Sequence, residues 1–202
     1  MFNSRFPPSK DQIAALSAFE GLGMDNISLV TSASQAEDAS EILMLAGEVG
    51  FDTESKPTFR KGEKSEGPHV LQFSTRERAF IFQSHVQECQ PVIAKLLESI
   101  QLKKIGFGLR GDLGQIWERF SIRPNGILDL DQSFKSLGYR NPVGAKSAIA
   151  ILFERRLQKS KRITTTNWSN KNLTDEQLIY AANDAYAALL VHHALKQSSQ
   201  AI

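Results

Sequence analysis

The segment Val49-Gly50-Phe51-Asp52-Thr53-Glu54 predicts a β-strand, and the residues on either side of it predict a helix before the strand and a hairpin after it. The helix is expected to run from a cap at Ser34 to about residue 46. Its predicted buried positions are Ala39, Ile42, Leu43 and Leu45. Residues 70–75 and 79–82 are two short apolar runs separated by charged turn residues, which predicts an antiparallel hairpin.

Strand and helix patterns alternate along the rest of the chain. Further strands are predicted at residues 27–31, 104–108 and 127–130, and further helices at 91–100, 112–120, 132–137, 144–157 and 174–196. The last helix begins at Thr174 with Gln177 three residues later, which is the pattern of a capping box. Together these patterns predict an α/β protein whose mixed sheet has five or six strands and carries helices on both faces.

The length of 202 residues suits one α/β domain, residues 26–202, preceded by an N-terminal helical extension, residues 1–25. The extension begins with Pro7-Pro8-Ser9, a plausible helix start, and Gly21 and Gly23 end its apolar pattern. Hydrophobic residues make up 41% of the chain and charged residues 23%, which is ordinary for a globular protein. The net charge of +2 does not by itself indicate a nucleic-acid-binding protein.

We expect a cytoplasmic protein that does not enter a membrane. The longest apolar stretch, around residues 185–195, is shorter than the roughly 20 residues that a bilayer requires. The N-terminus lacks the charged and then apolar run of a signal peptide. Cys89 is the one cysteine, so it cannot form an internal disulfide, which fits a reducing compartment.

Asp52 and Glu54 are two residues apart on the predicted strand, so their side chains project from the same face. Two ionised carboxylates side by side repel each other, and a cation relieves this repulsion. Oxygen ligands of this kind suit Mg²⁺ or Mn²⁺. Taken alone, Asp-x-Glu is also compatible with a solvated polar face at the edge of a sheet.

Two further segments place acids near turns and helices. In Ile105-Gly-Phe-Gly-Leu-Arg-Gly-Asp112 a strand runs into a glycine-bearing turn, and Asp112 stands at the start of a helix. Such an acid is often only a helix cap. Tyr180 and Asp184 are four residues apart on the last helix, hence one turn apart on one face. The alanines around them allow close packing of that helix against the sheet.

The segment from Arg140 to Lys171 is strongly basic. Eight of its residues are lysine or arginine, and Glu154 is its one acid. A run of this kind is usually a solvated face, but it also suits contacts with phosphates.

Three motifs, in this order, resemble those of the DEDDy branch of the DEDD exonuclease superfamily, which includes ribonuclease D and the Werner syndrome exonuclease domain. The first is Phe51-Asp-Thr-Glu54 and the second is Gly106-x-Gly108-x-x-x-Asp112. The third is Leu173-Thr-x-x-Gln177-x-x-Tyr180-Ala-Ala-x-Asp184, with Asn167-Trp-Ser before it. The resemblance extends from about residue 27 to residue 195.

The resemblance implies a ribonuclease H-like fold and a metal-dependent 3′–5′ exonuclease that releases 5′-mononucleotides from DNA or RNA. It implies that Asp52, Glu54, Asp112 and Asp184 hold two divalent cations, Mg²⁺ or Mn²⁺, and that Tyr180 orients the attacking water. Beside this site we place substrate contacts at Thr53, Phe107, Leu109, Arg110 and Lys146, with Phe107, Leu109 and Arg110 near the terminal base and Lys146 on a phosphate. The oligomeric state is not predicted.

Two other functions remain open at this point. A non-catalytic nucleic-acid-binding module on the same fold would be marked by loss of a carboxylate, and all four are present. A small-molecule α/β enzyme would need a phosphate-cradling glycine loop, but Gly106-Phe-Gly108 is not followed by the third glycine of the dinucleotide-binding fingerprint.

Overall fold

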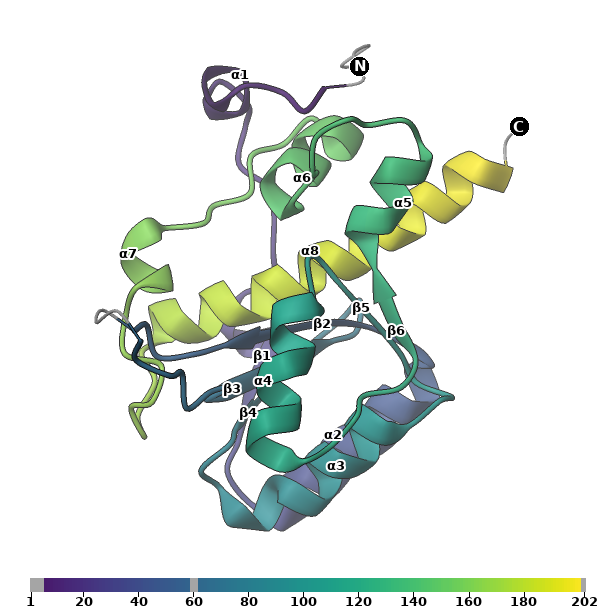
Figure 1. Ribbon diagram of the computed structural model, residues 1–202. Helices are drawn as coiled ribbons and strands as arrows, with labels where there is room; N and C mark the ends of the chain where they lie inside the picture. Colours follow the sequence, from purple (N-terminus) through teal and green to yellow (C-terminus); the bar gives the residue numbers. More distant parts are fainter. Residues whose placement is uncertain (1–5, 59–61, 201–202) are drawn as a thin grey trace.

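The computed structural model describes residues 6–58 and 62–200 and contains one mixed six-stranded sheet in the order β1-β4-β3-β2-β5-β6 (Figure 1). The strands are β1 (Ile27–Val30), β2 (Glu48–Glu54), β3 (Val70–Ser74), β4 (Ala79–Gln83), β5 (Lys103–Gly106) and β6 (Ile127–Asp129). The pairs β2–β3 and β3–β4 are antiparallel, and the pairs β1–β4, β2–β5 and β5–β6 are parallel. The predicted mixed sheet and its hairpin are therefore confirmed.

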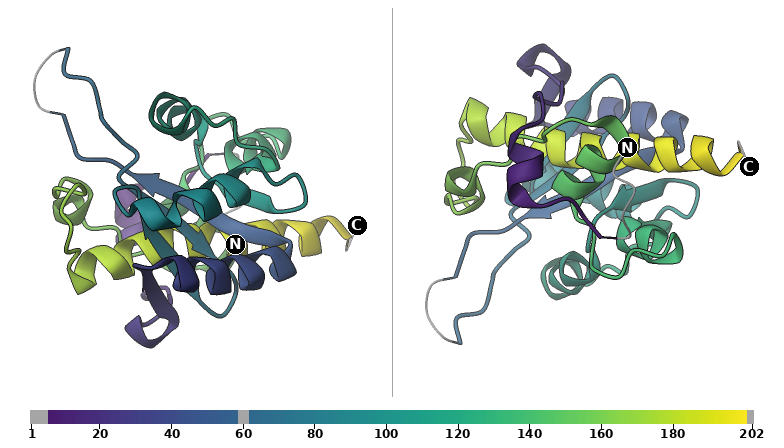
Figure 2. Two further views of the ribbon diagram at one scale, coloured as in Figure 1. Left: turned by 90° about the horizontal axis from the view of Figure 1, so that it is seen from below. Right: turned by 90° about the horizontal axis from the view of Figure 1, so that it is seen from above.

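Helices cover both faces of the sheet, as Figures 1 and 2 show. One face packs on α2 (Ala33–Ala46), α3 (Gln90–Glu98) and α4 (Arg110–Phe120) around a large apolar cluster that includes Phe51, Phe73 and Phe82. The long helix α8 (Asp175–Gln200) crosses the other face, with α6 (Ala145–Phe153) beside it. The shorter helices are α1 (Lys10–Ala14), α5 (Leu130–Ser136), α7 (Lys161–Thr164) and the 3₁₀ turns η1 (Met24–Asn26) and η2 (Gln87–Cys89).

The N-terminal helix is shorter than predicted. Ser9 and Gln12 form a capping box at the start of α1, but the helix ends at Ala14. It cannot continue, because the main chain after it pairs with another segment: Arg156 N donates to Ser17 O at 2.8 Å, and Phe19 N donates to Arg156 O at 3.0 Å. Residues 1–5 of the predicted extension lie outside the described residues, as do residues 201–202 of the predicted domain.

The predicted cap of the second helix was wrong by two residues. Ser32, not Ser34, caps α2, and its hydroxyl accepts a hydrogen bond from Gln35 N at 3.3 Å. The buried face consists of Ala36, Ala39, Ser40 and Leu43. Leu45 is 91% exposed, because two residues beyond Leu43 the helix has turned away from the sheet.

The predicted helix at 144–157 ends at Phe153, where Glu154 adopts a left-handed conformation with φ 53°. In Figure 1 the chain then runs above α8 from α6 to the short helix α7, which the sequence did not predict. The capping box of α8 is confirmed: Thr174 N donates to Gln177 Oε1 at 3.0 Å, and Gln177 N donates to Thr174 Oγ1 at 3.3 Å. Within the described residues, no helix is both long and apolar enough to cross a membrane.

Candidate active site

Small residues bring α8 unusually close to the central strand β2. A β-carbon at Gly50 would lie 1.8 Å from the carbonyl oxygen of Ala185, so only glycine permits this approach. Ala181 and Ala182 are fully buried on the same helix. This close contact places Asp184 of α8 beside the acids at the end of β2.

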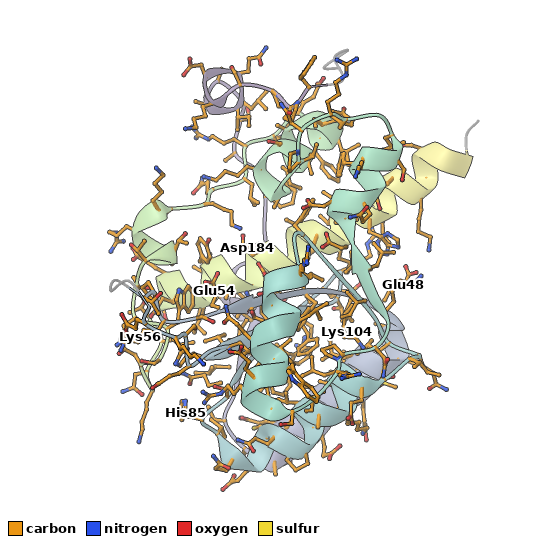
Figure 3. The ribbon with its side chains drawn as sticks, in the orientation of Figure 1. Glu48, Glu54, Lys56, His85, Lys104 and Asp184 are labelled. Carbon is orange, nitrogen blue, oxygen red and sulfur yellow. The ribbon has the colours of Figure 1, made fainter. Side chains whose placement is uncertain are left out.

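Three carboxylates converge there. Asp52 and Glu54 of β2 and Asp184 of α8 each offer one oxygen, and these oxygens all lie within 4.8 Å of one another. Figure 3 labels Glu54 and Asp184 where β2 passes beneath α8. Asp184 is only 4% exposed. The arrangement is a set of oxygen ligands of the kind that suits Mg²⁺ or Mn²⁺.

Burial and mutual repulsion raise the pKa values of the clustered carboxylates. Burial, together with repulsion from Asp184 and Asp112, raises the pKa of Asp52 to about 8. Burial and the neighbouring Asp52 raise the pKa of Glu54 to about 9. Because a divalent cation between these oxygens would favour their charged forms, this donor set fits a bound metal ion.

Asp112 lies at the edge of this group and outside the set of three. It occupies the first turn of α4 and accepts a hydrogen bond from the hydroxyl of Thr53, the residue between Asp52 and Glu54. Burial raises the pKa of Asp112, against the effect of the Thr53 bond. Thr53 thus connects the first and second motifs. Its side chain is 9% exposed and engaged with Asp112, which leaves little of it to contact a substrate.

The turn that leads to Asp112 is held by Asp129, a residue that sequence reasoning missed. The two carboxylate oxygens of Asp129 accept hydrogen bonds from Gly108 N and Leu109 N, each at 2.9 Å. Gly108 has a φ of +64°, which favours glycine at this place in the turn. The sequence shows that Asp129 lies between a strand and a helix. It does not show that this acid binds main-chain groups about 20 residues earlier in the chain.

Tyr180 stands one helical turn before Asp184, as expected. Its ring packs against the buried Trp168 of the Asn-Trp-Ser segment, with the ring centres 5.9 Å apart. Its hydroxyl lies 3.0 Å from Thr164 Oγ1 of α7. Burial and the nearby carboxylate of Asp184 raise the pKa of Tyr180 above its ordinary value, so the phenol is neutral near pH 7.

Lys159 is the second residue at this site that sequence reasoning did not single out. Its Nζ lies 2.6 Å from Asp184 Oδ2 and 5.6 Å from the centre of the Tyr180 ring. Burial opposes its charge, but the carboxylates of Asp184 and Asp52 more than compensate, so the pKa of Lys159 is raised. The basic run between Arg140 and Lys171 contained this lysine, but sequence did not indicate which of its cations faces the acids.

The predicted substrate contacts differ in exposure. Arg110 is exposed at the start of α4, and Phe107 is half-buried, with its ring stacked on Phe134 at 6.5 Å between centres. Lys146 is exposed, and its Nζ donates to the carbonyl oxygen of Lys159 at 2.9 Å. Leu109, another of the predicted substrate contacts, is fully buried and packs in the apolar cluster under α4, so this structure does not expose its side chain to a terminal nucleotide.

The raised pKa values predict how stability depends on pH in a chelating buffer. Between the ordinary values of 3.8 and 4.5 and the raised values of about 8 and 9, folded Asp52 and Glu54 hold protons that the unfolded chain has released. Raising the pH through this window therefore favours the unfolded state. We expect the thermal midpoint of the parent to fall, relative to that of Asp52→Asn, as the pH rises from about 5 to about 9. A constant difference between the two proteins over this range would contradict the pKa assignment.

Comparison with known proteins gives one family and one fold. Residues 27–200 match the family model described as 3′–5′ exonuclease. The chain is 30% identical over 162 residues to the bifunctional 3′–5′ exonuclease/ATP-dependent helicase WRN of Mus musculus, covering 79% of this chain but only 12% of that protein. Its structure is similar to that of the Nibbler EXO domain of Aedes aegypti, with a TM-score of 0.75, 20% identity, and coverage of 91% of this chain and 94% of that one. It is also similar to Trypanosoma brucei RNase D in complex with RNA U12, with a TM-score of 0.73, 18% identity, and coverage of 92% and 64%.

Proposed function

The chain belongs to the 3′–5′ exonuclease family, and from this premise we propose that it hydrolyses phosphodiester bonds at the 3′ end of a nucleic acid and releases 5′-mononucleotides with the help of two divalent cations, Mg²⁺ or Mn²⁺. The predicted family and the ribonuclease H-like exonuclease fold are confirmed. The match across residues 27–200 also argues against a small-molecule enzyme.

One observation carries the proposal: three carboxylates from β2 and α8 meet within 4.8 Å of one another, and a neutral tyrosine lies one helical turn away on the same helix. A binding module has no need of this arrangement, because clustered carboxylates repel the phosphates of a nucleic acid. A hydrolase needs it, since the cluster collects cations at the bond that breaks.

We assign the metal ligands to Asp52, Glu54, Asp112 and Asp184. Asp52, Glu54 and Asp184 offer oxygens within 4.8 Å of one another, and Asp112 is connected to this group through its hydrogen bond with the Thr53 hydroxyl. When bound, the two cations activate water and stabilise the charge that develops on the leaving oxygen. Asp129 is a positioning residue. Its hydrogen bonds fix the turn before α4, and Asp112 lies in the first turn of that helix.

We assign to Tyr180 the orientation of the attacking water. A phenol has one donor and two acceptor positions, so its bonds to Thr164 and to the carboxylate of Asp184 still leave a position for a water molecule. With its pKa raised, Tyr180 remains protonated and acts through a hydrogen bond rather than as a base.

The direction and the products of the reaction test the proposal. We expect nucleotides to leave one at a time from the 3′ end as 5′-monophosphates, whether the strand is DNA or RNA. Matched DNA and RNA oligonucleotides, each with a free or a blocked 3′ end, would be digested with Mg²⁺ or Mn²⁺ and the products identified by mass. Blocked strands should survive. Internal fragments, or products that carry a 3′-phosphate, would refute the proposal for either nucleic acid.

A further inference from the structure

A cavity of about 660 Å³ opens directly beside the carboxylates. Helix α1 of the N-terminal extension forms one wall, the segment between α6 and α7 forms another, and the first turns of α8 form the floor. Its volume lies within the range of roughly 300–1,000 Å³ that is usual for sites that take small ligands.

Cations dominate the polar lining of this cavity. Five of its residues are positively charged, namely Lys10, Lys146, Arg156, Lys159 and Arg162, and Glu176 is its one acid. Glu176 already pairs with Arg162 at 2.5 Å. In the described parts of the chain, no ion pair joins a carboxylate to Lys10, Lys146 or Arg156. These three charges therefore remain available to an anionic ligand.

Apolar side chains complete the lining. Ile13 of α1 and Ile163 of α7 line the cavity together with Ile179 and the ring of Tyr180 from α8. Ile179 is 39% exposed, which is high for an isoleucine of a folded domain. A lining that combines apolar side chains with cations suits a ligand with a flat ring and a phosphate, which is the chemistry of a nucleotide.

The cavity adjoins the active site at Lys159. This residue lines the cavity, and its Nζ lies 2.6 Å from Asp184, one of the three converging carboxylates. Tyr180 also lines the cavity and lies one helical turn from Asp184. A nucleotide in the cavity would therefore lie next to the phosphate on which the carboxylate site acts.

The extension that supplies one wall is firmly attached. Arg156 Nη1 donates to Ala14 O at 3.1 Å at the end of α1, and its main chain pairs with Ser17 and Phe19. Farther along, the side chain of Asn183 accepts from Leu22 N at 2.7 Å and donates to Leu22 O at 3.1 Å. The residue bound to the extension is thus the immediate neighbour of Asp184.

We propose that this cavity binds one nucleotide unit of the substrate strand next to the scissile phosphate, and that the N-terminal extension forms part of the subsite. The residues Lys10, Ile13 and Ala14 precede the segment 27–200 that matches the exonuclease model, so this wall is an addition to the matched domain. The inference rests on the proposed function, because it takes the strand to be the ligand.

Two substitutions test the subsite, each with a matched control on the surface. Lys10→Gln removes one cation of the lining, and Lys135→Gln removes an exposed lysine of α5 that does not line the cavity and lies outside the basic segment 140–171. Ala14→Trp places an indole in the cavity without changing charge, and Ala15→Trp places it at the neighbouring exposed position outside the lining. Thermal unfolding of all four variants shows which of them remain folded.

Binding of a 5′-labelled single strand would be followed by fluorescence anisotropy in chelating buffer, where no turnover interferes. We expect Lys10→Gln and Ala14→Trp to weaken binding about threefold or more, while both controls stay near the parent. The slope of log affinity against log salt should fall by about 0.7 for Lys10→Gln, as expected for one lost phosphate contact on a single strand. With cations present, KM for the strand should rise for the same two variants.

Equal affinities for all five proteins would overturn the subsite even if the parent digests the strand. If Lys10→Gln weakens strand binding but the parent hydrolyses nothing, the proposed function is refuted, while the proposed binding surface is still supported. If strand binding is unchanged but inhibition by added nucleoside 5′-monophosphate weakens in Lys10→Gln, the cavity holds the released nucleotide, and the strand subsite is wrong.

Discussion

Asp52→Asn is expected to lower the rate of nucleotide release by roughly 10⁴-fold or more, the scale at which removal of one member of a catalytic unit acts. The substitution removes one of three carboxylates that converge within 4.8 Å, and with it a ligand charge for the cations. It also removes repulsion from a cluster in which burial and neighbouring carboxylates raise the pKa of Asp52 to about 8. We therefore expect activity to vanish while thermal stability in chelating buffer near pH 8 rises.

The control for this variant is Asp38→Asn on the exposed side of α2, which should keep both activity and stability at the level of the parent. Single-turnover digestion of a 5′-labelled strand measures the rate, and thermal unfolding measures the stability. An Asp52→Asn protein that unfolds at a much lower temperature than the parent would mark Asp52 as structural. Retention of more than a few per cent of the parental rate would remove Asp52 from the metal ligands.

Asp184 would behave differently on substitution, although both acids are assigned as ligands. Lys159 Nζ lies 2.6 Å from Asp184 Oδ2, and the carboxylates keep this largely buried lysine charged. Asp184→Asn would leave that cation without its closest counter-charge, which offsets any relief of repulsion among the acids. For this reason Asp52 is the better position at which to separate catalysis from stability.

Tyr180→Phe is expected to reduce the single-turnover rate by roughly 10²–10⁴-fold, the range for groups that position or transfer a proton in the transition state. The change keeps the ring against Trp168 and removes only the hydroxyl, which lies 3.0 Å from Thr164. Since Tyr180 is not a metal ligand in our assignment, the loss should fall on kcat and leave the affinity for cations nearly unchanged.

Tyr186→Phe on the same helix is the matched control, because this half-buried ring lies six residues beyond Tyr180, on a different face. It should retain the parental rate. A loss of rate of less than about threefold in Tyr180→Phe, at saturating cation and enzyme, would be far smaller than the expected loss and would show that the hydroxyl is dispensable. The water would then need another partner.

Local patterns were sufficient for most of the fold. The strand at residues 49–54, the hairpin after it and the capping box at Thr174 all follow from short-range rules, and the structure has them. The errors occurred where a distant partner overrides local preference. The first helix stops at Ala14 because its continuation pairs with Arg156, about 140 residues later, and no pattern within residues 9–19 could reveal that.

The candidate site shows the same division. Asp52, Glu54 and Asp184 could be proposed from spacing and resemblance, because strand and helix periodicity fix which side chains share a face. Lys159 and Asp129 could not, since their roles depend on contacts across the fold: one with Asp184, and the other with the turn at Gly108. Leu109 was placed among the substrate contacts because of its position in the turn beside Asp112, whereas its apolar side chain is buried under α4.

Returning cations to metal-stripped protein tests directly whether this chain needs divalent cations to hydrolyse a nucleic acid. The protein would be treated with chelator, freed of it, and incubated with a 5′-labelled single strand while Mg²⁺ or Mn²⁺ is titrated back. We expect no digestion before the cations are added and, after their addition, a ladder of strands that shorten one nucleotide at a time from the 3′ end, with Asp52→Asn inactive throughout. Full digestion by the stripped parent in the presence of chelator would contradict this expectation.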